Sequence, residues 1–122
     1  MTELSISANS HRGKVRAKNE DMVLVSSQFI RDKSLITKVH LGPDSRYLVA
    51  VADGMGGLDD GDIASEEVQR SLCEFFAQLP GGLAFEDLED VIGEWGAQIN
   101  GEINAAASAA GRVRGTNLVA ML

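Results

Sequence analysis

The first part of the chain reads as strands, because apolar and polar residues alternate or gather in short apolar runs. Alternation over residues 4–8 predicts one strand, since successive strand side chains point to opposite faces. A short apolar run at 22–25 predicts a second strand, and residues 35–39 favour a third. Residues 47–52 give the strongest strand signal. That run is almost entirely apolar, which predicts a central strand covered on both faces.

Helical spacing begins after residue 60. Acidic residues around Asp62 precede apolar residues at Ala64, Val68 and Leu72, and carboxylates stabilise the first turn of a helix. Pro80 is expected to end this helix. A second helix is expected from about residue 86 to 110, with an apolar stripe formed by Leu88, Ile92, Trp95, Ile99, Ile103 and Ala107.

Three glycines interrupt the second helical pattern, at positions 93, 96 and 101. Each weakens a helix by about 1 kcal/mol relative to alanine. Their small size is expected to permit close packing against a neighbouring helix or sheet.

The last apolar run, residues 118–122, follows a glycine turn and predicts another strand. Such a strand needs partners along its edges and faces. We therefore expect residues 1–122 to form a single domain that is truncated at its C-terminus.

Composition narrows the classes of partner. The net charge is −7, which argues against nucleic acid as the main partner. No apolar stretch approaches a membrane span, the N-terminus lacks signal-peptide features, and Cys73 has no second cysteine with which to pair. These features favour a cytoplasmic protein with no membrane partner.

Charge is unevenly distributed. Residues 1–46 contain eight Lys/Arg against five Asp/Glu, and residues 47–122 contain three against thirteen. Arg12, Lys14, Arg16 and Lys18 alternate, so a strand would place them on one face. Two interpretations stay open: a solvated basic edge that discourages strand aggregation, or a rim that attracts an anionic substrate.

Two segments carry candidate chemistry. Asp53 and Gly54 end the strongest strand, and a carboxylate beside glycines is suited to hold a hard cation, although Asp-Gly is also a common turn pair. Arg16, Glu20 and Asp21 lie in the run RAKNED. The guanidinium suits a phosphate, and the alternative is a solvated surface charge.

Four motifs occur in a familiar order: GKVRAKNED at 13–21, VADGMGG at 51–57, GDIAS at 61–65 and GTN at 115–117. Together they resemble the N-terminal part of the bacterial metal-dependent type-2C serine/threonine protein phosphatases. The resemblance implies an α+β fold, the N-terminal part of a four-layer α-β-β-α sandwich with two central β-sheets flanked by helices.

The resemblance also implies roles for individual residues. The family holds two Mn²⁺ or Mg²⁺ ions, which activate a water that attacks the phosphorus of phosphoserine or phosphothreonine. Asp53 matches the bridging metal ligand, Gly54 the residue whose carbonyl binds one metal, and Glu20 an acidic position that contacts the metals through water. Arg16 matches the residue that grips the substrate phosphate, so Arg16 and Asp53 are the expected catalytic residues.

The family's other metal-binding aspartates lie beyond Leu122, so this chain alone is expected to be weak or inactive. The implied partners are phosphoserine and phosphothreonine proteins and a cognate serine/threonine kinase.

Two alternatives stay open. A non-catalytic pseudophosphatase or binding module would recognise a kinase or phosphoprotein without turnover; Met55 and Leu58, where family members often carry histidine, favour it. A regulatory phosphatase of the same fold would act on one dedicated partner. A cysteine phosphatase does not fit, because Leu79 stands where its loop would need arginine.

Overall fold

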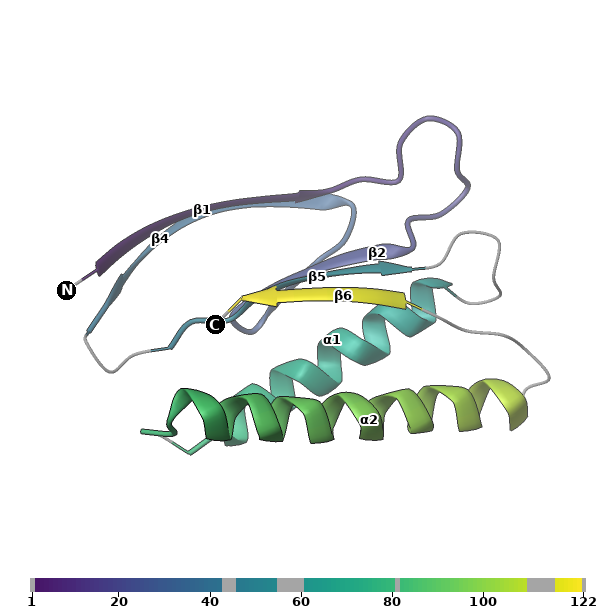
Figure 1. The fold of residues 1–122 in the computed structure, drawn as a ribbon. Coiled ribbons are helices and arrows are strands. Elements are labelled where there is room, and N and C mark those ends of the chain that lie inside the picture. Colours follow the sequence, from purple (N-terminus) through teal and green to yellow (C-terminus); the bar gives the residue numbers. More distant parts are fainter. Residues whose placement is uncertain (1, 43–45, 55–60, 81, 110–115, 122) are drawn as a thin grey trace.

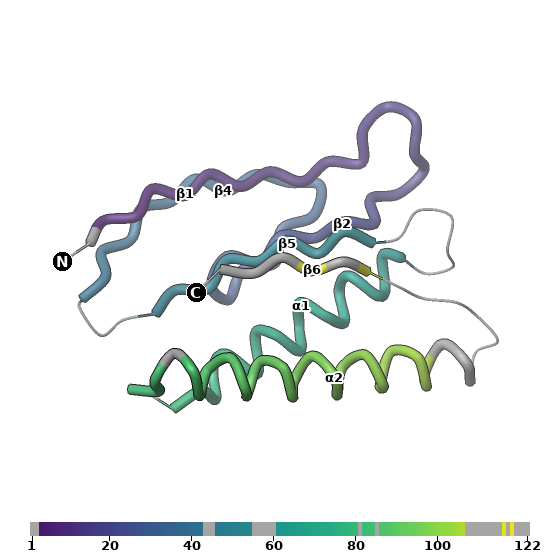
Figure 2. Tube along the Cα trace, in the orientation of Figure 1, coloured from purple at the N-terminus to yellow at the C-terminus, as the bar shows by residue number. Residues whose placement is uncertain are grey.

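The computed structural model describes residues 2–42, 46–54, 61–80, 82–109 and 116–121 (Figures 1 and 2). Along the chain these residues form β1 (Thr2–Ser10), β2 (Asp21–Val25), β3 (Gln28–Ile30), β4 (Lys33–Leu41), β5 (Val49–Gly54), α1 (Gly61–Gln78), α2 (Phe85–Ala109) and β6 (Thr116–Met121). Strands β1 and β4 pair in one sheet, and the second sheet has the order β3-β2-β5-β6. All neighbouring strands are antiparallel. The expected α+β fold with two sheets is confirmed.

The two sheets and the helices form layers. The β1–β4 ribbon lies on one side of the four-stranded sheet, and both helices lie on the other (Figure 1). Val25 and Ile30 pack toward Ile6 of β1, whereas Leu24 packs toward Leu72 of α1. Strand β2 is therefore buried on both faces, which makes it the centre of a partial sandwich.

Strand β5 is central in its sheet, but the expectation that both of its faces are covered is wrong. Ala50 and Ala52 are buried, while the Val51 side chain is 46% exposed. The apolar cluster between the two sheets is built on Val23 and Val25 of β2 and Ile30 of β3. The β1–β4 ribbon therefore covers β2 and β3 and leaves Val51 in contact with solvent.

Both expected helices are confirmed. Helix α1 ends just before Pro80, and α2 buries Leu88, Ile99 and Ile103 of its apolar stripe, the latter two against Val68 of α1. The expectation of close packing at the α2 glycines is wrong, because a Cβ on any of the three would meet no atom within 4 Å. Gly93 and Gly101 are exposed, and Gly96, although half-buried, also faces open space.

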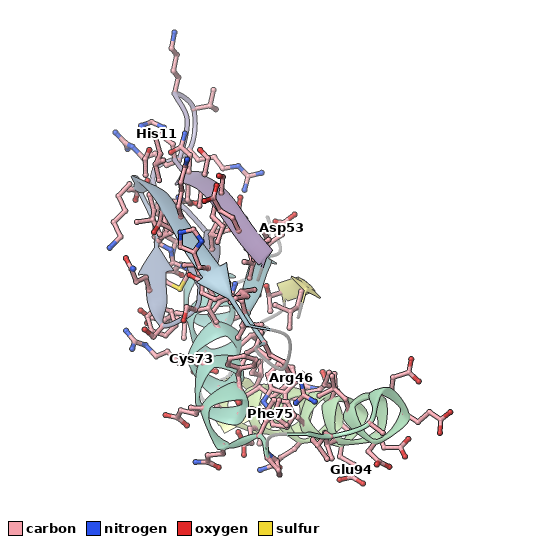
Figure 3. The ribbon with its side chains drawn as sticks, turned by 90° about the vertical axis from the view of Figure 1, so that its left-hand side faces the viewer. His11, Arg46, Asp53, Cys73, Phe75 and Glu94 are labelled. Atoms are coloured by element: carbon pink, nitrogen blue, oxygen red, sulfur yellow. The ribbon has the colours of Figure 1, made fainter. Side chains whose placement is uncertain are left out.

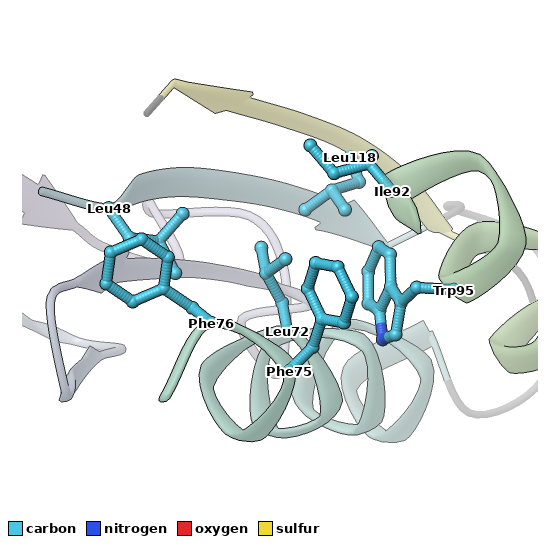
Figure 4. A pocket seen from close by; sticks show the side chains of 7 residues that line it. All are labelled: Leu48, Leu72, Phe75, Phe76, Ile92, Trp95 and Leu118. Carbon is cyan, nitrogen blue, oxygen red and sulfur yellow. The ribbon is translucent and has the colours of Figure 1, made fainter. Parts of the chain in front are cut away.

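An apolar cavity of about 250 Å³ lies between the helices and the larger sheet, lined by Leu48, Leu72, Phe75, Phe76, Ile92, Trp95 and Leu118 (Figure 4). The Trp95 indole stacks on Phe75 with ring centroids 5.7 Å apart, and its Nε1 donates to Ser71 Oγ at 2.8 Å. Because the indole N–H already has a partner, the cavity wall is apolar in character and unsuited to a phosphate.

Several sequence expectations fall on residues outside those described. These are most of the glycine loop after Gly54, with Met55 and Leu58, the acidic residues before Gly61, and the glycine turn before Thr116. Over the described part of the chain, no helix combines the length and the apolar character needed to cross a bilayer.

Replacing Gly93 or Gly101 by alanine should stabilise the protein. Alanine has a better helix propensity than glycine, and each new methyl group would enter open space. The free energy of urea unfolding, followed by circular dichroism, should rise by up to about 1 kcal/mol for each change.

The control is Gly82→Ala, because Gly82 has a φ of +77° that an alanine adopts only with strain. That change should lower the free energy of unfolding. A loss of stability in Gly93→Ala would instead show that the missing side chain at Gly93 is needed for packing.

Candidate functional site

Two carboxylates face each other across neighbouring strands of the larger sheet. The β2–β5 register pairs Asp21 directly with Asp53, and such opposite residues project from the same face. Burial raises the pKa of the Asp21 carboxyl, and the hydrogen bond to Asp53 and its negative charge raise it further. The Gly54 N–H and the Arg16 charge act in the opposite direction. The strand ends therefore concentrate negative charge that a proton or a cation would relieve.

The backbone approaches itself closely beside this pair. The Gly54 N–H donates to the Glu20 carbonyl at 3.2 Å, and a Cβ at Gly54 would collide with the carbonyl oxygens of Glu20 and Gly61. The Thr116 hydroxyl donates to the Asp53 carbonyl at 2.9 Å. Glycine is therefore required at position 54 for the start of α1 to reach the ends of β2 and β5.

Glu20 and Arg16 lie next to each other in the loop before β2. Arg16 Nη1 is 3.7 Å from Glu20 Oε2, and the side chains are 63% and 14% exposed, respectively. Glu20 Oε2 is buried and has no hydrogen-bond partner among the described residues. Glu20 thus offers an unused acceptor inside the site, whereas Arg16 presents most of its guanidinium to solvent, where an anion can reach it.

The basic residues between β1 and β2 lie in a loop, so the interpretation that they share one strand face is wrong. Asn19 organises this loop: its Nδ2 donates to Ser10 Oγ at 2.7 Å, and its Oδ1 accepts from the Asp21 N–H at 3.0 Å. Asp32 Oδ1 accepts from the Arg12 N–H at 3.1 Å. Local polar contacts of this kind compete with strand pairing and fix where β2 begins.

One of the basic residues joins the loop to α1. Lys18 Nζ lies 3.0 Å from Asp62 Oδ1 in the first turn of the helix. Burial by itself would raise the pKa of Asp62, but the hydrogen bond and charge of Lys18, together with the backbone N–H groups of Ile63 and Asp62, outweigh burial and lower it. The contact holds the loop that carries Arg16 against the beginning of α1.

Sequence reasoning missed Gln69 on α1. Its side chain is fully buried, and its Nε2 donates to the carbonyls of Met22 at 2.8 Å and Ala50 at 3.2 Å. Gln69 thereby ties α1 to the two strands that carry the carboxylate pair. No local signal distinguishes it, since it lies one position beyond the apolar period.

The donors that meet here fit part of a site for a hard cation. Carboxylates come from Asp21 and Asp53, which are paired across the strands, and from Glu20, whose backbone carbonyl binds the Gly54 N–H. Hard cations prefer such oxygen ligands. Within the described residues, no three His, Cys, Asp or Glu side chains cluster closely enough to hold a metal ion. Figure 3 shows Asp53 beside the strands, well away from Glu94 on the acidic helix α2.

The chain is similar to the serine/threonine protein phosphatase PstP of Mycobacterium tuberculosis, in strains CDC 1551 / Oshkosh and ATCC 25618 / H37Rv. In both cases 119 residues align at 30% identity and cover 98% of this chain. The chain spans only 19% of the length of these curated relatives. No protein-family model matches the chain, and no solved structure matches it. The similarity supports, at this coarse level, the resemblance to serine/threonine protein phosphatases.

Replacing Asp21 by asparagine should stabilise the metal-free protein at neutral pH. A carboxyl whose pKa is raised on folding contributes stability below its unfolded pKa of about 3.9, and this contribution is lost as the pH rises through the folded value. Asparagine cannot ionise, so the variant avoids that loss.

Urea unfolding in the presence of a chelator would measure the effect. The variant should be the more stable protein at pH 7, and the difference should narrow toward pH 3. Equal stability of both proteins at pH 7 would contradict the repulsion between Asp21 and Asp53.

Proposed function

We propose that this chain is the N-terminal part of a metal-dependent, type-2C serine/threonine protein phosphatase domain, a single domain whose C-terminal part lies beyond residue 122. One observation carries the proposal: the Asp21–Asp53 pair lies beside Gly54, and Glu20 links this edge to the exposed guanidinium of Arg16. The similarity to a serine/threonine protein phosphatase over nearly the whole chain gives independent support.

The proposed cofactors are Mn²⁺ or Mg²⁺, two ions in the complete domain. Asp53 and the Gly54 carbonyl would hold them. Glu20 would contact them through water, which suits its buried Oε2, an oxygen that has no hydrogen-bond partner among the described residues. Bound cations would supply a water of lowered pKa for attack on phosphorus. The aspartates that complete the ligand set would come from the rest of the domain.

Arg16 would bind the substrate phosphate. Its guanidinium donates paired, charge-assisted hydrogen bonds, and its 63% exposure allows a phosphoserine or phosphothreonine to reach it from solvent. Its Nη1 lies 3.7 Å from Glu20 Oε2, on the side of the carboxylate pair. Arg16 would therefore orient the phosphate over the strand ends where Asp53 lies.

Cys73 does not fit the role of a nucleophile. It is half-buried on α1, and its Sγ lies 3.8 Å from the Ser26 carbonyl. Direct attack by water is accordingly the proposed route. The proposed partners are phosphoproteins and a cognate serine/threonine kinase in the cytoplasm, without nucleic acid, in keeping with the net charge of −7.

A second candidate is a module that binds phosphoproteins without turnover. The specific observation in its favour is that Arg16 and Lys14 are exposed in a structured loop, where they could bind a phosphate without any metal. The two candidates differ in whether the protein hydrolyses a phosphopeptide or only binds it.

Replacing Asp53 by asparagine should abolish metal-dependent hydrolysis in the longer protein. The change removes a ligand charge but little volume, so the fold should persist. Turnover of a phosphothreonine peptide with Mn²⁺ should fall by roughly a hundredfold or more, since even residues that only orient metal ligands typically cost 10–100-fold.

Asp90→Asn, the same change at an exposed position on α2, is the matched control and should keep full turnover. Full turnover in Asp53→Asn would contradict the assignment of Asp53 as a metal ligand. An intact wild-type protein that binds phosphopeptide but never hydrolyses it would favour the binding module.

Replacing Arg16 by alanine should raise KM for the same peptide by about tenfold or more, because charge-assisted hydrogen bonds contribute about 1.5–3 kcal/mol. Stability should change little, since the side chain is mostly exposed. Steady-state kinetics would separate KM from kcat. Arg70→Ala removes another exposed arginine, on α1, and should leave KM unaltered; an unchanged KM in Arg16→Ala would count against its phosphate role.

A further inference from the structure

Arg31 lies between β3 and β4, yet its side chain reaches the beginning of both β2 and α1. Its Nε donates to the Asp21 carbonyl at 3.1 Å. Its Nη2 donates to the Asp62 carbonyl at 2.9 Å and to Ser65 Oγ at 2.6 Å. Because a guanidinium holds its donors in one rigid plane, these bonds fix the start of α1 relative to the start of β2.

Ser65 extends this connection by one step. Its side chain is fully buried, and its hydroxyl accepts from Arg31 while donating its single proton. The Glu20 carbonyl, at 2.6 Å, is the nearer acceptor; the Asp62 carbonyl, at 3.1 Å, already accepts from Arg31. The hydroxyl therefore passes the polarisation of the guanidinium on to the Glu20 carbonyl.

The Glu20 carbonyl receives a second donor from the other strand. The Gly54 N–H binds the same oxygen at 3.2 Å, and the close approach of Gly54 to Glu20 leaves no room for a side chain. A continuous path thus runs from Arg31 through Ser65 and the Glu20 carbonyl to Gly54. It joins the three segments around the candidate site: the starts of β2 and α1 and the end of β5.

A lysine at position 31 could not make the same set of hydrogen bonds. Its ammonium presents three donors from one point on a flexible stem, whereas the acceptors here belong to three residues, Asp21, Asp62 and Ser65. A lysine could keep the charge and at most part of the hydrogen bonding. The change Arg31→Lys therefore tests the hydrogen-bond geometry of Arg31 while keeping its positive charge.

We propose that Arg31, acting through Ser65, is the positioning residue that holds the Glu20–Asp21 and Asp53–Gly54 segments at the separation needed for cation binding. The consequence for cations rests on the proposed function. The positioning itself belongs to the metal-free protein and can be tested without any metal.

The first test is hydrogen exchange of the Gly54 amide in Arg31→Lys, measured by NMR without metal. Gly54 exchange should accelerate at least tenfold more than exchange of the Leu24 amide in the buried strand β2. Arg46→Lys is the matched control, because Arg46 also donates to backbone carbonyls, Leu83 at 2.8 Å and Pro80 at 3.5 Å, outside the site. It should change both amides by the same factor.

If Arg31→Lys does not fold, Ser65→Ala serves as the second variant. It removes a single oxygen, the hydroxyl that connects Arg31 to the Glu20 carbonyl. Selective acceleration at Gly54 in either variant supports the proposal. Exchange at Gly54 that merely follows Leu24 in the folded variants would overturn it, because Arg31 would then contribute to overall stability alone.

The second test is Mn²⁺ affinity by calorimetry, measured in the longer protein that would supply the remaining ligands. Arg31→Lys should raise the Kd by about tenfold, and Arg46→Lys should leave it within twofold of the wild-type value. An unaltered Kd in Arg31→Lys would overturn the functional half of the proposal. A longer wild-type protein that binds no Mn²⁺ would contradict the proposed metal site, while the exchange of Gly54 would still decide whether Arg31 positions these segments.

Discussion

The antiparallel pairing of β2 with β5 is the constraint on which the rest of the structure depends. Its register sets Asp21 opposite Asp53, and like charges directly opposite one another destabilise a sheet. The structure tolerates this repulsion where β2 begins and β5 ends. A glycine that admits no side chain lies beside it, as does a buried carboxylate oxygen of Glu20 that has no hydrogen-bond partner among the described residues. Such a concentration of unfavourable features at one edge is typical of a functional site.

The core behind this edge keeps the two strands in register. Leu24 and Val25 are fully buried on opposite faces of β2, and burial of such side chains stabilises a fold by about 1.5–3 kcal/mol each. Gln69 adds a polar tie from α1 to both strands. Helix α1 is therefore both a cover for the apolar face and the element whose first turn approaches the carboxylates, so that packing and site geometry are set by the same contacts.

Local patterns in the sequence were sufficient to predict the long helices and the apolar strands. The apolar period of α1 and α2 predicts both helices, and the apolar runs predict β2 and β5, because these patterns reflect one continuous buried face. Strand β3 was missed, since three residues between two tight turns carry no period. The burial of Val51 was overestimated because coverage depends on where β1 and β4 lie, which no local pattern encodes.

The sequence singled out candidate residues for the site, but it did not predict how they are arranged in space. Asp53, Gly54, Glu20 and Arg16 stand out by residue type and order, and the structure brings the segments that carry them together. The partner of Asp53, Asp21, depends on strand register. Arg31 was missed because its contacts reach Ser65, 34 residues away, and such a contact leaves no trace in neighbouring positions.

Paramagnetic broadening of NMR signals by Mn²⁺, below one equivalent, tests whether a cation binds where β2 begins and β5 ends. We expect the amide signals of Asp21, Asp53 and Gly54 to broaden first and to recover with a chelator, while Leu24 and the rest of β2 broaden less as their distance from the site grows. Broadening centred on the acidic first turns of α2, around Glu86 and Asp87, or no selective broadening at all, would contradict a cation site at the ends of β2 and β5.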